Sequence, residues 1–137
     1  DLYEGGIRVP AFVNWPGQVE QGSLEMPVHI SDWLPTLCEL TGNDTSLDEL
    51  NLDGQNIWPF LTGEQPIPKN RTMYWKISQA YAVREGDWKL LVHRNSDKTE
   101  LFNLKNDFRE ENDLSEEHPE KVKHMMNLLE KFKEGDR

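Results

Sequence analysis

The sequence predicts an α+β fold in which a C-terminal helix packs on a four-stranded antiparallel sheet. Two observations carry this prediction. Two short extended runs, Ala80–Arg84 and Trp88–His93, flank Glu85-Gly86-Asp87, and a glycine between two such runs is typical of a tight β-hairpin turn. Near the end of the chain, apolar side chains recur at the spacing of one helical face, at Val122, Met125, Met126, Leu129 and Phe132.

The segments on either side of the hairpin complete the predicted sheet. Thr72–Ile77 and Thr99–Leu104 are predicted as its two further strands, and a sheet of about four strands is large enough to need a covering helix. Pro119 is tolerated at the first position of that helix, and Gly135 is a signal for its end. Burying the apolar stripe is expected to contribute about 1.5–3 kcal/mol for each large side chain.

The residues before the sheet are predicted to form one strand and one helix. The run from Ile7 to Val13 is short and hydrophobic enough for a buried strand, and Pro10 within it favours an edge position or a start after the proline. Ser31-Asp32 is an N-cap signal for a helix that ends at Thr41-Gly42-Asn43. A polar loop and a short helical turn, Gln55–Leu61, are predicted next. The segment Thr62–Asn70, which contains glycine and prolines, is the predicted linker between two parts, residues 1–65 and residues 66–137.

Charge and hydropathy argue against two classes of partner. The 137 residues include 25 acidic and 15 basic side chains, for a net charge of -10, whereas nucleic-acid binding favours the opposite sign. No apolar run approaches the roughly 18 residues of a membrane span, so neither nucleic acid nor membrane is a predicted partner. Cys38 is the single cysteine. Its place with Leu34, Leu37 and Leu40 on the apolar side of a predicted helix favours a buried, unreactive thiol.

The residues do not compose a complete catalytic set. The four histidines are scattered without zinc-site spacing, and no Ser, Cys or Thr lies in a glycine-flanked nucleophile turn. We therefore predict no catalytic residue and no metal ligand within this chain.

The order of several short strings is more specific than any one of them. Together they resemble the C-terminal part of the sulfatase family, the type I sulfuric ester hydrolases of the alkaline phosphatase superfamily, from Tyr3 to about Phe132. In chain order the strings are Tyr3-Glu4-Gly5-Gly6-Ile7-Arg8-Val9-Pro10, Trp15-Pro16-Gly17, Asp32-Trp33-Leu34-Pro35-Thr36-Leu37, Leu52-Asp53-Gly54, Ala82-Val83-Arg84, Gly86-Asp87-Trp88-Lys89-Leu90, Glu100-Leu101-Phe102-Asn103-Leu104, and Asp107 with Glu110.

The resemblance implies where this chain belongs in a whole sulfatase. Such an enzyme has a large α/β domain and a smaller C-terminal subdomain, an antiparallel four-stranded sheet packed by the terminal helix. Residues 1–65 would be the tail of the large domain, its last strand and helix, and residues 66–137 the subdomain. We expect the chain to be an excised piece whose partner is the missing N-terminal domain. Without that domain, the exposed apolar run Ile7–Val13 is expected to cause self-association.

The resemblance also implies the chemistry of the whole enzyme. A sulfatase uses a formylglycine, made from the Cys or Ser of a C/S-x-P/A-x-R motif, and a calcium ion to hydrolyse aryl or carbohydrate sulfate esters. Cys38 is followed by Glu39-Leu40, so it does not match that motif, and the family's active-site lysine would fall upstream of Asp1. This chain alone is therefore expected to be inactive and to hold neither cofactor.

Six residues are candidates for contact with a sulfated small molecule or glycan, through charge pairing and ring stacking: Glu4, Arg8, His29, Trp75, Lys76 and Arg84. Structural roles compete with this interpretation. An ion pair would explain Arg8, a helix cap shared with Asp32 would explain His29, and a place in the core would explain Trp75.

Two other functions remain open. A phosphonate monoester hydrolase is the nearest enzymatic alternative within the superfamily, and a free-standing carbohydrate-binding or interaction module is the alternative from another class. The resemblance is compatible with a periplasmic, secreted or lysosomal location, and the sequence does not choose between them.

Overall fold

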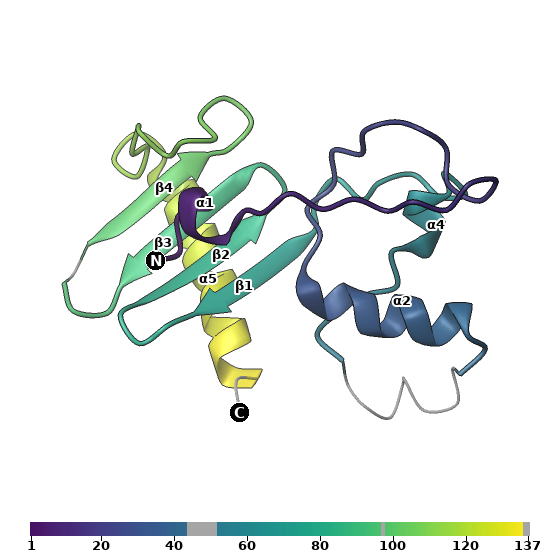
Figure 1. The fold of residues 1–137 in the computed structure, drawn as a ribbon. Helices are drawn as coiled ribbons and strands as arrows, with labels where there is room; N and C mark the ends of the chain where they lie inside the picture. The colour runs from purple at the N-terminus through teal and green to yellow at the C-terminus, as the bar shows by residue number, and fades with distance from the viewer. Residues whose placement is uncertain (44–51, 97, 136–137) are drawn as a thin grey trace. The chain divides into compact units, whose positions relative to one another are not determined.

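The computed structural model describes residues 1–43, 52–96 and 98–135 (Figure 1). Contacts divide the chain into two compact units. The sheet unit contains Asp1–Pro10 and Lys69–Arg137, and the helical unit contains Ala11–Pro68. The first ten residues thus fold with the sheet, although the sequence places them with the helix that follows. The assignment of residues 1–65 and 66–137 to two sulfatase domains stays a prediction.

The sheet unit confirms the predicted antiparallel sheet. Its four strands are hydrogen-bonded in chain order, each antiparallel to the next. Gly86 joins the second and third strands with a φ of 58°, which favours glycine, and a Cβ there would lie 2.8 Å from the carbonyl oxygen of Lys69. The strands are β1 (Thr72–Lys76), β2 (Ala80–Glu85), β3 (Trp88–His93) and β4 (Thr99–Asn103).

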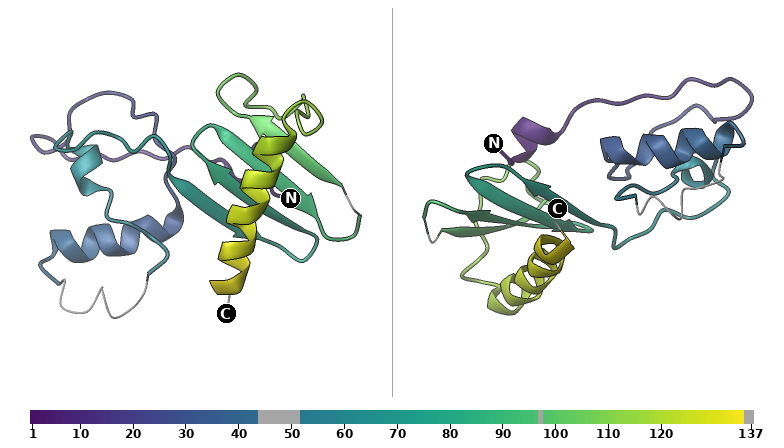
Figure 2. Two further views of the ribbon diagram at one scale, coloured as in Figure 1. Left: turned by 180° about the vertical axis from the view of Figure 1, so that it is seen from behind. Right: turned by 90° about the horizontal axis from the view of Figure 1, so that it is seen from below.

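The terminal helix α5 (Pro119–Gly135) covers one face of this sheet, as predicted (Figure 2). Met125 and Leu129 of the helix are buried in one core cluster with strand residues Val83, Leu90 and Leu101. The last residue of the stripe, Phe132, is partly exposed. Its ring stacks on Tyr74 of β1 at a centroid distance of 5.6 Å, which extends the contact beyond the buried core.

The first ten residues cover the opposite face of the sheet. Alternate residues of a strand point to opposite faces, so Ala82 and Leu91 face away from α5 and pack with Leu2 in a second apolar cluster. The short helix α1 (Glu4–Ile7) lies over this face, on the far side of the sheet from α5 (Figure 2, right). The sheet is therefore the middle layer between α5 and the N-terminal segment.

The strand predicted over Ile7–Val13 is wrong. The carbonyl of Tyr3 accepts hydrogen bonds from the N–H groups of Gly6 and Ile7, so the start of the run closes into the helical turn α1. Residues 8–15 have no regular secondary structure. A strand needs a neighbour to satisfy its backbone groups, and apolar character alone does not supply one. Val9 and Phe12 are 76% and 90% exposed.

The helical unit is built around a buried carboxylate. Asp32 closes the 3₁₀ turn η1 (Ile30–Asp32) and precedes the predicted helix, here α2 (Trp33–Leu40). Its two oxygens accept hydrogen bonds from the backbone N–H groups of His29 (2.7 Å) and Gln55 (3.1 Å). These contacts join α2 to the segment that leads into the short helix α4 (Trp58–Leu61).

Helix α2 buries a different side from the one predicted. The sequence places Leu34 and Leu37 on the apolar side, but they are 52% and 54% exposed, whereas Pro35 and Thr36 are buried. The hydroxyl of Thr36 accepts a hydrogen bond from the N–H of Ile57 at 2.9 Å. Polar contacts with residues 55–57 thus decide which side of the helix faces inward.

Candidate functional site

Four charged side chains meet between α1 and the sheet. Lys89 of β3 is fully buried, and its Nζ lies 2.9 Å from Oε1 of Glu4 and 2.8 Å from Oε1 of Glu110. Arg84 of β2 approaches the other oxygen of Glu4 at 3.9 Å. We call Glu4, Arg84, Lys89 and Glu110 the buried charge cluster. It joins α1, two strands and the loop after β4.

The charges of the buried charge cluster are balanced. It contains two cations and two carboxylates, and burial of a charge is tolerated only with such partners. Burial lowers the pKa of the Arg84 guanidinium, and the nearby charge of Glu4 opposes this effect. Glu110 has a φ of 58°, which a non-glycine residue seldom adopts. Oε2 of Glu110 accepts a hydrogen bond from the N–H of Glu4.

A second polar network ties the N-terminal segment to the sheet. Glu100 of β4 accepts a hydrogen bond from the Tyr3 hydroxyl at 2.6 Å, contacts Nε2 of His93 at 2.7 Å and accepts from Nζ of Lys98 at 2.7 Å. Burial, the hydrogen bond to Glu100 and the charge of Glu100 raise the pKa of Tyr3. Burial alone would raise the pKa of Glu100, but hydrogen bonds from Lys98, Tyr3 and His93 outweigh it and lower that pKa.

The network around Glu100 predicts a loss of stability in acid. Because the folded-state pKa of Glu100 is lowered, its carboxylate stabilises the fold above its unfolded-state pKa of about 4.3, and this contribution is lost as the pH falls through the folded value. We expect Glu100→Gln to flatten the decline in unfolding free energy below about pH 4.5, measured by urea titration. Glu116→Gln, at an exposed position, is the control. Parallel declines in the Glu100→Gln variant and the unchanged protein would contradict this assignment.

The structure brings some of the predicted site residues together. Glu4 and Arg84 meet in the buried charge cluster.

A third predicted site residue, Arg8, lies beside an exposed aromatic ring. Its guanidinium carbon is 6.0 Å from the centre of the Phe108 ring, and that of Arg109 is 5.6 Å from the same centre. Phe108 is 56% exposed, and both arginines are exposed. An exposed ring flanked by two guanidinium groups offers apolar surface and anion-binding donors in one place.

The other predicted site residues lie apart from this group or have structural roles. Trp75 packs against the second apolar cluster, on the sheet face that carries α1. Lys76 is exposed. Its register partner Tyr81 packs on the α5 side, and directly paired residues share a face, so Lys76 lies on the α5 face, opposite to Trp75. His29 belongs to the helical unit and caps η1, with reciprocal contacts to Asp32.

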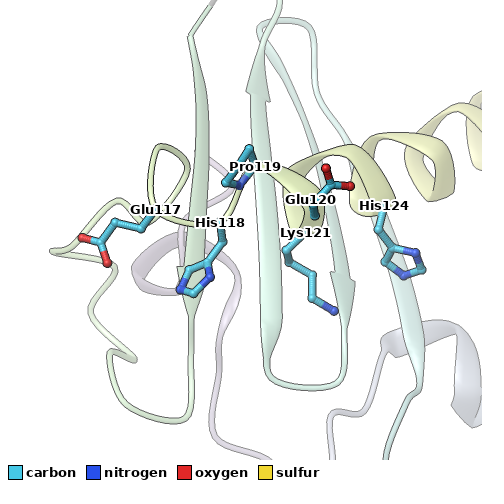
Figure 3. Close-up of a pocket in the computed structure, with 6 residues that line it drawn as sticks. All are labelled: Glu117, His118, Pro119, Glu120, Lys121 and His124. Carbon is cyan, nitrogen blue, oxygen red and sulfur yellow. The ribbon is translucent and has the colours of Figure 1, made fainter.

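A shallow hollow of about 530 Å³ lies at the start of α5 and is lined by Glu117, His118, Pro119, Glu120, Lys121 and His124 (Figure 3). The rings of His118 and Trp88 pack edge to face, with their centroids 5.2 Å apart. Nζ of Lys121 lies 5.8 Å from the centroid of the Trp88 ring. Nε2 of His124 lies 2.8 Å from a carboxylate oxygen of Glu85. These side chains attach the helix to β2 and β3.

Neither a metal centre nor a membrane span is found among the described residues. Residues 1–43, 52–96 and 98–135 contain no group of three or more His, Cys, Asp or Glu side chains placed to hold a metal ion. Over the same part of the chain, no helix combines the length and the apolar composition needed to cross a bilayer.

One protein-family model matches the chain over all of its described residues. The model described as "N-sulphoglucosamine sulphohydrolase, C-terminal" covers residues 1–135. The chain belongs to this family of sulfatase C-terminal regions. A sulfatase of Formosa agariphila is 29% identical over an alignment of 134 residues, and the match covers 85% of this chain and 24% of the relative. Human arylsulfatase A is 34% identical over 92 residues, 64% of this chain and 18% of the relative.

Solved structures of similar chains share the fold. The crystal structure of Ps i-CgsB in complex with k-i-k-neocarrahexaose has a TM-score of 0.75 and 29% identity, covering 86% of this chain and 27% of that one. The structure of BT4656 in complex with its substrate D-glucosamine-2-N,6-O-disulfate has a TM-score of 0.59 and 25% identity, covering 75% and 23%. This chain thus spans between 18% and 27% of the length of these relatives.

Sequence reasoning missed Lys89 and Glu110 as members of the buried charge cluster. One signal for Lys89 is present in the sequence, because it interrupts the apolar strand Trp88–His93. A lysine within a buried strand requires a carboxylate partner. The sequence does not name that partner, since Glu4 lies 85 positions away.

Proposed function

We propose that this chain is the C-terminal part of an enzyme that hydrolyses sulfate esters of carbohydrates, and that it has no activity alone. The observation that carries the proposal is the sulfatase family match over residues 1–135. A carbohydrate substrate is supported by two similar solved structures, one in complex with k-i-k-neocarrahexaose and the other in complex with its substrate D-glucosamine-2-N,6-O-disulfate.

The chain's own residues support the proposed inactivity. No Cys or Ser begins a C/S-x-P/A-x-R sequence in the 137 residues, and the described side chains do not form a metal-binding group. We therefore assign no residue of this chain to a formylglycine or to a calcium ion. In a whole sulfatase these groups would supply a nucleophile and a Lewis acid.

The contribution that we propose for this chain is contact with the sulfated saccharide. Arg8 and Arg109 flank the exposed Phe108 ring, and a guanidinium group pairs well with a sulfate because it donates two parallel hydrogen bonds. Glu4 and Arg84 are engaged in the buried charge cluster, so their role here is to support this surface. His29, Trp75 and Lys76 stay candidates without further support.

The proposed partner is the rest of the sulfatase polypeptide. Ile30 of η1 and Leu34 and Leu37 of α2 are exposed at sequence spacings of four and three. An apolar stripe of this kind is normally covered in a folded protein, and the relatives are about four times as long as the segment that they share with this chain. Self-association of the chain alone through its exposed apolar residues stays a prediction.

An assay with a fluorogenic aryl sulfate and a sulfated disaccharide tests the proposal. We expect no turnover by the 137-residue chain and clear turnover by the whole sulfatase that contains it. In that enzyme, Arg8→Ala should raise KM for the disaccharide roughly tenfold, because a hydrogen bond to a charged group contributes about 1.5–3 kcal/mol. Lys131→Ala, at an exposed position on α5, should leave KM unchanged.

Three outcomes would overturn the proposal. Turnover of sulfate esters by the 137-residue chain would contradict its inactivity. Preference of the whole enzyme for an aryl phosphonate monoester would favour the phosphonate hydrolase alternative. Tight, specific binding of the isolated chain on a glycan array, without sulfatase activity in the whole protein, would favour the carbohydrate-binding module.

A further inference from the structure

We propose that Glu4, Lys89 and Glu110 form an ionic clamp that holds residues 1–10 on the sheet, separately from the packing of α5. These three residues are called the clamp below. The inference goes beyond the proposed function, because it concerns how the N-terminal segment is held and does not depend on which ester the whole enzyme hydrolyses.

Because Lys89 is buried, its ammonium group requires the two carboxylates of the clamp as partners. Its side chain is 0% exposed, so its ammonium group has the carboxylates of Glu4 and Glu110 in place of water, at 2.9 Å and 2.8 Å. Taking an ammonium group out of water is costly unless carboxylates of this kind surround it. Moving either α1 or the loop that carries Glu110 would leave a buried charge without its partner.

Glu110 contributes to the clamp through both charge and backbone contact. One of its carboxylate oxygens pairs with Lys89, and the other accepts the N–H of Glu4, which opens α1. Its φ of 58° is costly for a non-glycine residue and persists only where the surroundings fix it. The loop after β4 therefore has a strained backbone at Glu110, the residue that binds the start of α1.

The clamp and α5 lie on opposite faces of β3. Leu90 points toward Met125 and Leu129 in the first core cluster, and its neighbour Lys89 points toward α1. Because the two faces have separate contacts, breaking the clamp should release the N-terminal segment while α5 stays packed.

The variants Lys89→Met and Glu4→Gln should differ in a definite order. Lys89→Met leaves the carboxylates of Glu4 and Glu110 close together without a cation between them, so they repel each other as well as losing a partner. Glu4→Gln leaves Lys89 paired with Glu110 and should have a smaller effect. Simple loss of packing volume would not predict this order, since methionine fills about the same space as the lysine stem.

Hydrogen exchange followed by mass spectrometry on the 137-residue chain tests the clamp. The amides of Gly6, Ile7 and Arg8 are hydrogen-bonded within the N-terminal segment. We expect their exchange in Lys89→Met to accelerate at least about tenfold, as for a buried pair that has lost one member. Exchange in residues 119–135 should change by less than about twofold. Lys123→Met, at an exposed position on α5, should match the unchanged protein in both regions.

Two results would overturn the clamp. One is equal exchange of residues 1–10 in Lys89→Met and in the unchanged protein. The other is equal acceleration in residues 1–10 and 119–135, which would mean that the cluster holds the whole sheet unit together. If Lys89→Met does not fold, Glu4→Gln decides by the same two comparisons, because it keeps the buried lysine paired.

Discussion

Replacing Gly54 with alanine is expected to separate residues 52–57 from α2. A Cβ at this position would lie 2.1 Å from the carbonyl oxygen of Ser31 and 2.8 Å from the backbone nitrogen of Asp32. These are backbone atoms, which cannot rotate away as a flexible side chain does. Overpacking costs about 1–3 kcal/mol, and moving Gln55 off the buried carboxylate of Asp32 adds about 1–3 kcal/mol for the lost hydrogen bond.

Urea unfolding followed by NMR signals from the helical unit measures this loss. Gly22→Ala is the matched control, because a Cβ there has no heavy atom within 4 Å, and it should change the unfolding free energy by less than about 0.5 kcal/mol. Equal urea midpoints for Gly54→Ala and Gly22→Ala would show that the two segments are not in contact as described.

Truncating Leu129 to alanine is expected to have the largest effect on the sheet unit. The side chain is 1% exposed and belongs to the core cluster with Val83, Leu90 and Leu101. Removing a buried leucine side chain costs about 2–5 kcal/mol, because apolar contact is lost and a cavity is left. That is a large share of the roughly 5–15 kcal/mol that stabilises a typical domain.

Urea unfolding followed by circular dichroism at 222 nm measures this change. Lys123→Ala, on the exposed side of the same helix, should stay within about 0.5 kcal/mol of the unchanged protein. A loss of less than about 1 kcal/mol for Leu129→Ala would mean that α5 does not pack through this residue.

Much of the sheet unit can be predicted from local signals. Gly86 marks the hairpin turn because a tight reversal needs a positive φ, and the structure confirms both flanking strands. The spacing of Met125 and Leu129 predicts which side of the last helix is buried. For the candidate site, Glu4 and Arg84 are found together, whereas contact of any of the six residues with substrate stays a prediction.

The sequence by itself determined the hairpin, the covering helix and the sulfatase family, because turn chemistry, helical spacing and the order of short strings are all local or linear properties. Only the tertiary structure decided that Ile7 belongs to a helical turn, that Leu34 faces outward, and that Lys89 is paired with Glu4 and Glu110. The physical reason is that a buried charge or an apolar run is compatible with several partners. Which partner it finds depends on residues as far as 85 positions away.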